Sequence, residues 1–333
     1  MNVRRRLIPT AAVTAVTALA LGTLSACSSD SAAAGSTDKF DVVASFYPMA
    51  FLAERIGGDH VNVTSLTQPG QEPHDLEISA KQTAQLEEAD AALHLKGLQP
   101  TVDEAIGQSG VKTKIDAAIL TTLEAHGAGD GHGHEDGHAD EDHAHEGEDG
   151  HEGHSHETEG GKDPHVWLDP VKYAEVAEGV GQAFEKADPD HAADYRKNTE
   201  TLVGELNELD ATLKAGLKDR KTDVFITTHA SFGYFAERYG LSEEAINGLD
   251  PESEPSAARV KQLARTAKAD GVTTIFYETL VSDDTAKTVA KDSGLKTDVL
   301  DPLEGITDAS RGDDYFEVMQ SNLKALQTAL GSA

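Results

Sequence analysis

Basic side chains are scarce in this sequence. Its 333 residues include 28 lysines and arginines against 59 aspartates and glutamates, which gives a formal net charge of −31 at pH 7. A protein that binds nucleic acid meets the phosphates with basic side chains, which release the counterions of the polyanion. The composition therefore excludes a nucleic-acid-binding protein and disfavours acidic ligands, whereas cations are attracted to such a surface.

Cysteine occurs once, as Cys27. No intramolecular disulfide can therefore form, and no second thiol is present for a metal or for catalysis. The segment before Cys27 has three arginines, an apolar run from Leu7 to Leu24 and then small residues. This order is typical of an export signal rather than of a membrane-spanning helix.

The four residues LSAC that end at Cys27 resemble a lipobox, in which a signal peptidase cuts before a cysteine that carries lipid. We expect residues 1–26 to be a lipoprotein signal peptide and residues 27–38 to be a flexible tether. The protein is then exported and anchored by lipid on Cys27 to the outer face of the cell membrane. The alternative is a plain secreted protein with an incidental cysteine, and the adjacent arginines leave a twin-arginine export route open.

Two motifs of nucleotide and metal enzymes are missing from the sequence: the GxxxxGK[ST] phosphate loop and the HExxH helix. Without the first, the energy for any transport must come from partner chains. Without an HExxH motif, the chain lacks the helix with which many zinc proteases hold their metal.

From Phe40 onwards, short β-rich runs alternate with helix-like segments. This alternation predicts parallel sheets with helices on their faces. It occurs in both halves, and a chain of this length is expected to form two lobes around separate cores. We therefore predict an α/β protein with two parallel-sheet lobes, whose strand-like runs are Val42–Phe46, Val61–Leu66, Ala91–Leu95, Asp223–Thr228, Thr273–Thr279 and Lys296–Asp301.

A long amphipathic helix is predicted between the lobes, because leucines recur at helical spacing from Leu202 to Leu217. At 1.5 Å per residue this helix is on the order of 40 Å long, so it can act as a strut that limits hinge closure. The alternative is an ordinary surface helix of one lobe. The expected boundaries are 39–187 for the N-terminal lobe, 188–218 for the linking helix and 219–333 for the C-terminal lobe.

An insertion rich in histidine and acid lies within the N-terminal lobe. Between Gly131 and His156 there are eight histidines and nine carboxylates, with no lysine or arginine. We expect a disordered loop over residues 125–162 whose imidazoles form weak, exchangeable metal sites. Whether it serves as a metal chaperone, a sensor or a buffer stays open. Its histidines are His132, His134, His138, His143, His145, His151, His154 and His156.

Three histidines outside this loop lie just beyond predicted strands or in loops between elements: His74, His165 and His229. Ligands in open α/β sheets collect at the carboxyl ends of strands, so these side chains can converge. His74 and His165 each follow a proline, which stiffens the backbone.

The spacing of these histidines is too wide for a local zinc motif, and a loop histidine is usually solvated or hydrogen-bonded. The spacing alone therefore leaves a metal site and an ordinary structural role both open. We expect three other histidines, which lack this setting, to be structural or on the surface: His60, His94 and His191.

From Phe40 the chain resembles the cluster A-I solute-binding proteins, which are metal-binding lipoproteins that serve ABC transporters for zinc or manganese. The resemblance rests on six segments in the same order: ASFYPMAFLAERIGGD, PGQEPHDLEIS, DPHVWLDP, THASFGYFAERYGL, EPSAARV and LDPLEG. It implies two α/β lobes joined by a long rigid helix, with one metal in the cleft between the lobes.

The resemblance also implies the ligands. His74 and His165 match the first two ligands of the family, both from the N-terminal lobe. His229 matches the third, where zinc-type members have histidine and manganese-type members have a carboxylate. The fourth position varies between carboxylate and water. Zinc-importing members with a similar PLE sequence point to Glu304, and manganese-type members make Asp301 the runner-up.

Two other glutamates are candidates for supporting roles: Glu72, two residues before His74, and Glu278, in the segment FYETL. We expect Glu278 to be a structural residue near the cleft wall, and Glu72 to contact a ligand at most. Three imidazoles and one carboxylate suit four-coordinate zinc, whereas manganese prefers more oxygen ligands. Zn²⁺ is therefore the expected metal and Mn²⁺ the alternative.

The predicted function is that of an extracytoplasmic zinc-binding protein, not an enzyme. It captures Zn²⁺ as a monomer and delivers it to a membrane permease that is driven by a cytoplasmic ATPase. The alternatives are a manganese-binding protein of the same family, a zinc-dependent hydrolase with an open coordination position, and a surface zinc buffer or adhesin that uses mainly the histidine-rich loop.

Overall fold

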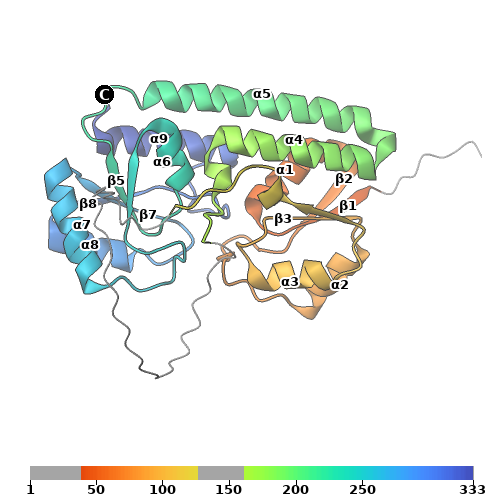
Figure 1. The fold of residues 1–333 in the computed structure, drawn as a ribbon, viewed down its shortest axis with the longest axis horizontal. Coiled ribbons are helices and arrows are strands. Elements are labelled where there is room, and N and C mark those ends of the chain that lie inside the picture. The colour runs from red at the N-terminus through yellow and green to blue at the C-terminus, as the bar shows by residue number, and fades with distance from the viewer. Residues whose placement is uncertain (1–38, 127–160, 333) are drawn as a thin grey trace, which may run out of the picture. The chain divides into compact units, whose positions relative to one another are not determined.

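The computed structural model describes residues 39–126 and 161–332 (Figure 1). Several predictions fall outside these residues: the signal peptide of residues 1–26, the lipid site at Cys27, the tether of residues 27–38, and the eight metal-binding histidines between Gly131 and His156. They stay predictions.

Each half of the described chain builds one parallel four-stranded sheet. The first has the spatial order β2-β1-β3-β4 and the second the order β6-β5-β7-β8. The strands are β1 (Phe40–Ala44), β2 (Val61–Ser65), β3 (Ala91–His94), β4 (Thr113–Asp116), β5 (Val224–Thr227), β6 (Ser242–Ala245), β7 (Thr274–Tyr277) and β8 (Lys296–Val299). The predicted class, α/β with two parallel-sheet lobes, is confirmed.

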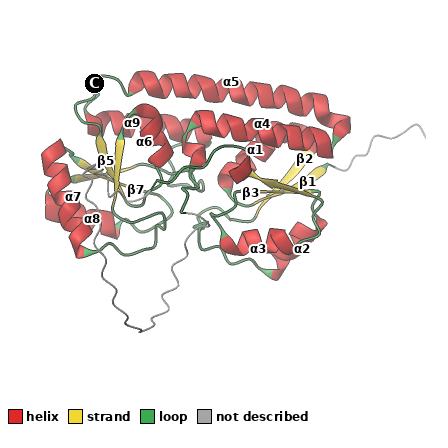
Figure 2. Cartoon of the chain, viewed as in Figure 1, coloured by secondary structure: helices red, strands yellow, loops and turns green. Residues whose placement is uncertain are grey.

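Helices cover both faces of each sheet (Figure 2). The first sheet lies among α1 (Tyr47–Gly57), α2 (Ala80–Glu88) and α3 (Pro100–Gln108), and the second among α6 (Gly233–Tyr239), α7 (Ala257–Asp270), α8 (Asp284–Ser293) and α9 (Tyr315–Leu330). Side chains alternate across a strand. Val43 of β1 therefore packs toward α2 and α3, while its neighbour Val42 packs toward α1. Such strands are buried on both faces, which explains their apolar sequences.

The longest helix, α5 (Ala192–Gly216), extends over both sheets, and α4 (Pro170–Ala187) lies alongside it (Figure 1). Its 25 residues span about 38 Å. The helix was expected over 188–218. In the structure a separate 3-10 turn, Pro189–His191, precedes it, so the α-helix begins at Ala192. Gly181 of α4 faces Thr199 of α5, where an added Cβ would overlap the threonine hydroxyl, so glycine lets the two helices approach closely.

The expectation of separate cores for the two lobes is wrong. One continuous apolar cluster includes Phe46 and Ile56 near the first sheet, Leu206 of α5, and Phe235 and Leu326 near the second. The reason is geometric: α5 packs against α1 and α9, so its apolar stripe joins the inner faces of both lobes. Only the outer faces of the sheets have clusters of their own. The lobe boundaries given above stay a prediction.

The lobes are also joined by aromatic contacts. Tyr315, the first residue of α9, lies with its ring 5.4 Å from that of Phe51 and 4.9 Å from that of Tyr173. Its hydroxyl donates to the carbonyl of Trp167 at 2.7 Å. The start of the last helix is therefore part of the N-terminal lobe's core, and this arrangement opposes a free hinge between the lobes.

The shared core predicts that both lobes unfold together. We expect urea to unfold the protein in a single transition, with the same midpoint by Trp167 fluorescence and by far-UV circular dichroism. Leu206→Ala should lower the free energy of unfolding by about 2–5 kcal/mol at both probes, because it leaves a cavity under α5. The matched control is Glu208→Ala on the exposed face of α5. Two separate transitions in the parent protein would contradict the shared core.

Candidate metal centre

His74 lies in the loop between β2 and α2, after Pro73. Its backbone N–H donates to Glu72 Oε1 at 2.7 Å, which holds the turn of the loop. The side chain is 13% exposed, more than that of His165, His229 or Glu304, which are all at 1% or less. Solvent therefore reaches the cluster from the side of His74.

His165 belongs to the segment DPHVWLDP, in which a 3-10 turn, Val166–Leu168, leads into α4. Asp163 Oδ1 accepts two hydrogen bonds from His165, one from the backbone N–H at 2.9 Å and one from Nδ1 at 2.7 Å. The side chains of Asp163 and His165 are both fully buried. The carboxylate therefore fixes the ring and leaves Nε2 directed into the cleft.

His229 follows β5, at the carboxyl end of the second sheet, as expected for a ligand position. Its Nδ1 donates to Glu278 Oε1 at 2.9 Å, and the hydroxyl of Thr228 donates to the same oxygen at 2.7 Å. Glu278 comes directly after β7 and is buried. The expectation that Glu278 is a structural residue of the cleft wall agrees with this contact.

Glu304 lies in the loop LDPLEG after β8. Leu303 before it has φ 60°, in the left-handed region that β-carbon crowding disfavours by roughly 1–2 kcal/mol. Two hydrogen bonds hold this conformation: Leu303 N–H donates to Asp301 Oδ1 at 2.8 Å, and Trp167 Nε1 donates to the carbonyl of Pro302 at 2.7 Å. The second bond joins the Glu304 loop to the His165 loop.

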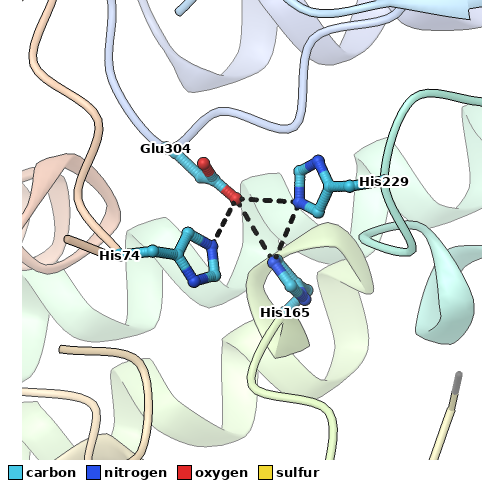
Figure 3. Close-up of side chains that lie close together, drawn as sticks. All are labelled: His74, His165, His229 and Glu304. Atoms are coloured by element: carbon cyan, nitrogen blue, oxygen red, sulfur yellow. Dashed lines mark hydrogen bonds and ion pairs between the residues drawn. The ribbon is translucent and has the colours of Figure 1, made fainter. Parts of the chain in front are cut away.

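Four side chains, two from each half of the chain, converge on one another (Figure 3). Glu304 Oε1 lies 3.3 Å from Nε2 of His74, 3.2 Å from Nε2 of His165 and 3.4 Å from Nε2 of His229. The Nε2 atoms of His165 and His229 are 3.4 Å apart. In a tetrahedral zinc site with bonds of about 2.0–2.1 Å, neighbouring ligand atoms lie about 3.3 Å apart. These four distances match that spacing, and all four ligand atoms lie within 4.8 Å of one another.

Protons balance the charge of this cluster when no metal is bound. Burial lowers the pKa of His165, but the Asp163 and Glu304 carboxylates outweigh burial and raise this pKa to about 9. Burial also acts to lower the pKa of His229, and Glu278 and Glu304 raise it well above its ordinary value. Burial acts to raise the pKa of Glu304, but the facing histidines hold it well below its usual range. The ionised carboxylate of Glu304 thus faces the protonated rings of His165 and His229.

The structure brings together the four residues that were expected as ligands, and it places Asp301 elsewhere. Both oxygens of Asp301 are engaged: Oδ1 accepts from Leu303 N–H, and Oδ2 accepts from Thr279 and Ser310 at 3.0 and 3.1 Å. Asp301 therefore supports the Glu304 loop, whereas Glu304 Oε2 is buried and has no hydrogen-bond partner among the described residues.

Among the described residues, His60, His94 and His191 lie outside the cluster. His60 pairs with Asp194 and stacks on His191, and His94 pairs with Asp103. These are structural contacts, as expected. His126 was expected to belong to the disordered loop over residues 125–162, but it is partly buried and its ring contacts Asp163 and Glu237. The sequence feature that could have pointed to His126 is its position just before the histidine-rich insertion, whose far end leads to His165.

Comparison with known proteins places these observations in a family. Residues 42–329 match the family described as "Zinc-uptake complex component A periplasmic". The "Zinc-binding protein AdcA" of Streptococcus pyogenes is 38% identical over 299 residues, which cover 87% of this chain and 56% of that protein. The "Zinc-binding lipoprotein AdcA" of Streptococcus pneumoniae is 36% identical over 310 residues, covering 91% and 58% respectively. The chain thus spans little more than half the length of these relatives.

The fold is likewise similar to a solved structure, the Zn(II)-bound ZnuA-like domain of Streptococcus pneumoniae AdcA. The TM-score is 0.68 at 32% sequence identity, and the match covers 88% of this chain and 99% of that domain. The similarity therefore includes both parallel-sheet lobes and the helices between them.

Replacing the carboxylate at the centre of the cluster should weaken metal binding strongly. We expect Glu304→Gln to raise the dissociation constant for Zn²⁺ by on the order of 100-fold or more, because even outer partners of ligands contribute 10–100-fold. The matched control is Asp103→Asn, which changes a partly buried carboxylate that pairs with His94 away from the metal centre. Competition with a chromophoric chelator measures the Zn²⁺ dissociation constants of both variants. Equal affinities for the two variants would show that Glu304 does not bind the metal.

Zinc binding at pH 7 should release protons into the solvent. The pKa of metal-free His165 is about 9 and that of His229 is raised as well, so both rings carry protons that zinc must displace. The apparent affinity should therefore rise with pH up to about 9 and fall on acidification. Isothermal titration calorimetry in buffers of different ionisation enthalpy counts the released protons. Heats that do not depend on the buffer at pH 7 would contradict the protonated state.

Proposed function

The chain belongs to the family of periplasmic zinc-uptake complex components, and from this premise we propose that it captures Zn²⁺ outside the cytoplasm and delivers it to a membrane importer. The observation that carries the proposal is the spacing of Glu304 Oε1 and three imidazole nitrogens, at 3.2–3.4 Å. Three imidazoles and one carboxylate form the borderline-soft, four-coordinate donor set that zinc favours. Mn²⁺, the alternative, prefers more oxygen ligands.

We assign the ion to His74, His165, His229 and Glu304. Asp163 and Glu278 act on it indirectly, because each holds the Nδ1 of a histidine and so keeps the ring's Nε2 available to the metal. The other three ligands are buried, so the ion enters and departs on the side of the site where His74 is exposed. Release to a transporter therefore needs the loop of His74 to move, while the packed core keeps the other ligands in place.

A closed set of four protein ligands argues against a hydrolase, because an enzyme of that kind keeps a coordination position for activated water. The family is one of solute-binding transport proteins. The chain has no GxxxxGK[ST] loop, so a permease and a separate ATPase supply the passage and the energy. Whether the protein acts as a monomer belongs to the same proposal.

Attachment to the membrane is assigned to lipid on Cys27, which lies outside the described residues. The lipobox-like LSAC supports it, and one relative is named a zinc-binding lipoprotein. Among residues 39–126 and 161–332, no helix combines the length and apolar character needed to cross a membrane. The histidine-rich tract is assigned weak accessory zinc sites on its sequence alone.

Metal analysis of protein purified without chelator tests the function. We expect zinc to be the main metal, with one tightly held ion that His229→Ala loses. The matched control is His60→Ala, because His60 pairs with Asp194 away from the centre and should leave the ion in place.

Cells that lack the protein should grow poorly in chelated medium, and added zinc should restore their growth. Manganese as the main metal in native protein, unaffected by His229→Ala, would overturn the zinc assignment. Normal growth of the deletion strain in chelated medium would overturn the import role.

A further inference from the structure

A second group of potential metal ligands lies outside the metal centre. Glu124 and His126 end the first described stretch, and Glu237 lies on α6. One ligand atom from each of the three lies within 4.8 Å of the others. We propose that these three side chains form a second, weaker divalent-cation site, which uses His126 Nε2 and one oxygen of each glutamate.

The ring of His126 is oriented as the rings of the main ligands are. Its Nδ1 lies 2.9 Å from Asp163 Oδ2, and its Nε2 lies 3.2 Å from Glu237 Oε2. His165 and His229 likewise bond a buried carboxylate through Nδ1 and present Nε2 to the cleft. A carboxylate on one ring nitrogen fixes the tautomer and makes the other nitrogen a better metal ligand.

The backbone around His126 is held in place by α6. An added Cβ at Gly233 would lie 2.5 Å from His126 Cβ and 2.9 Å from Asp163 Oδ2, so only glycine lets the histidine pack here. The hydroxyl of Tyr234 accepts from the N–H of Glu124 at 2.7 Å and donates to the carbonyl of Asp163 at 2.8 Å. The site is therefore built on packed main chain.

The donor set indicates the kind of ion. One imidazole with two carboxylates suits borderline divalent cations such as Zn²⁺. Binding is weaker than at the main centre for two reasons: Glu237 is 58% exposed, and Lys172 lies 2.7 Å from Glu124 Oε1 and competes for that carboxylate. Water completes the coordination.

Asp163 connects the two sites. Its Oδ1 holds His165 and its Oδ2 holds His126, so one buried carboxylate orients a ligand of each site. The second site thus lies beside the main centre, one carboxylate away. A cation held there is stored close to the ion that the transporter receives.

The competing explanation is an ion-pair network, in which a protonated His126 bridges Asp163 and Glu237 with no metal. Diffraction data collected at the zinc absorption edge separate the two explanations. Crystals of the mature protein with excess Zn²⁺ should show an anomalous peak about 2.0–2.1 Å from His126 Nε2, in addition to the peak at the main centre. The second peak should vanish in Glu237→Gln and in His126→Gln and remain in the control Glu178→Gln, another exposed glutamate.

A zinc titration in solution gives an independent readout. Its background is the full-length mature chain with the eight tract histidines replaced by asparagine, which removes their contribution. After one equivalent of Zn²⁺, we expect a second binding step whose dissociation constant rises at least about 10-fold in Glu237→Gln. The first step should be the same in all variants.

No peak at His126 and no second step would leave the ion-pair network as the explanation and overturn the proposal. An unchanged second step in both Glu237→Gln and His126→Gln would overturn it too. The proposed function is judged separately, by the peak at His74, His165, His229 and Glu304, so either proposal can fail alone.

Discussion

A single buried carboxylate, that of Glu304, determines which charges the surrounding side chains must carry. It is fully buried and faces three imidazoles, and one of its oxygens has no hydrogen-bond partner among the described residues. An unpaired charge in such a place costs several kcal/mol, so the carboxylate requires positive charge beside it. Protons on His165 and His229, whose pKa values are raised, supply this charge in the metal-free protein. In the proposed function, a divalent cation takes the place of these protons.

The fold keeps this cluster together by joining the lobes instead of separating them. Its four side chains come from four different loops, and two of these loops are tied by the hydrogen bond from Trp167 Nε1 to the carbonyl of Pro302. Tyr315 bonds the carbonyl of Trp167 in turn, and α5 gives both lobes one core. Three of the four side chains are therefore enclosed by packing, whereas His74 is partly exposed.

Much of the fold could be predicted from the sequence, since alternating apolar strands and helices specify parallel sheets. The shared core could not, because the apolar stripe of α5 does not tell which partners cover it. His74, His165 and His229 could be proposed from their places beside prolines and strand ends. Glu304 needed the family resemblance, because its burial depends on the left-handed turn at Leu303. Asp163 lies in the segment DPHVWLDP two residues before His165, but its second contact, with His126, could not be predicted because it forms only when two separate segments meet.

The contact of Tyr315 with the N-terminal lobe also bears on how the chain folds during biosynthesis. Phe51 is made early, whereas α9 is made after almost every other element described here. The inner core of the N-terminal lobe therefore stays incomplete, with apolar surface uncovered, until the final helix arrives. Until α9 has been made, the emerging chain exposes apolar surface of the kind that chaperones bind.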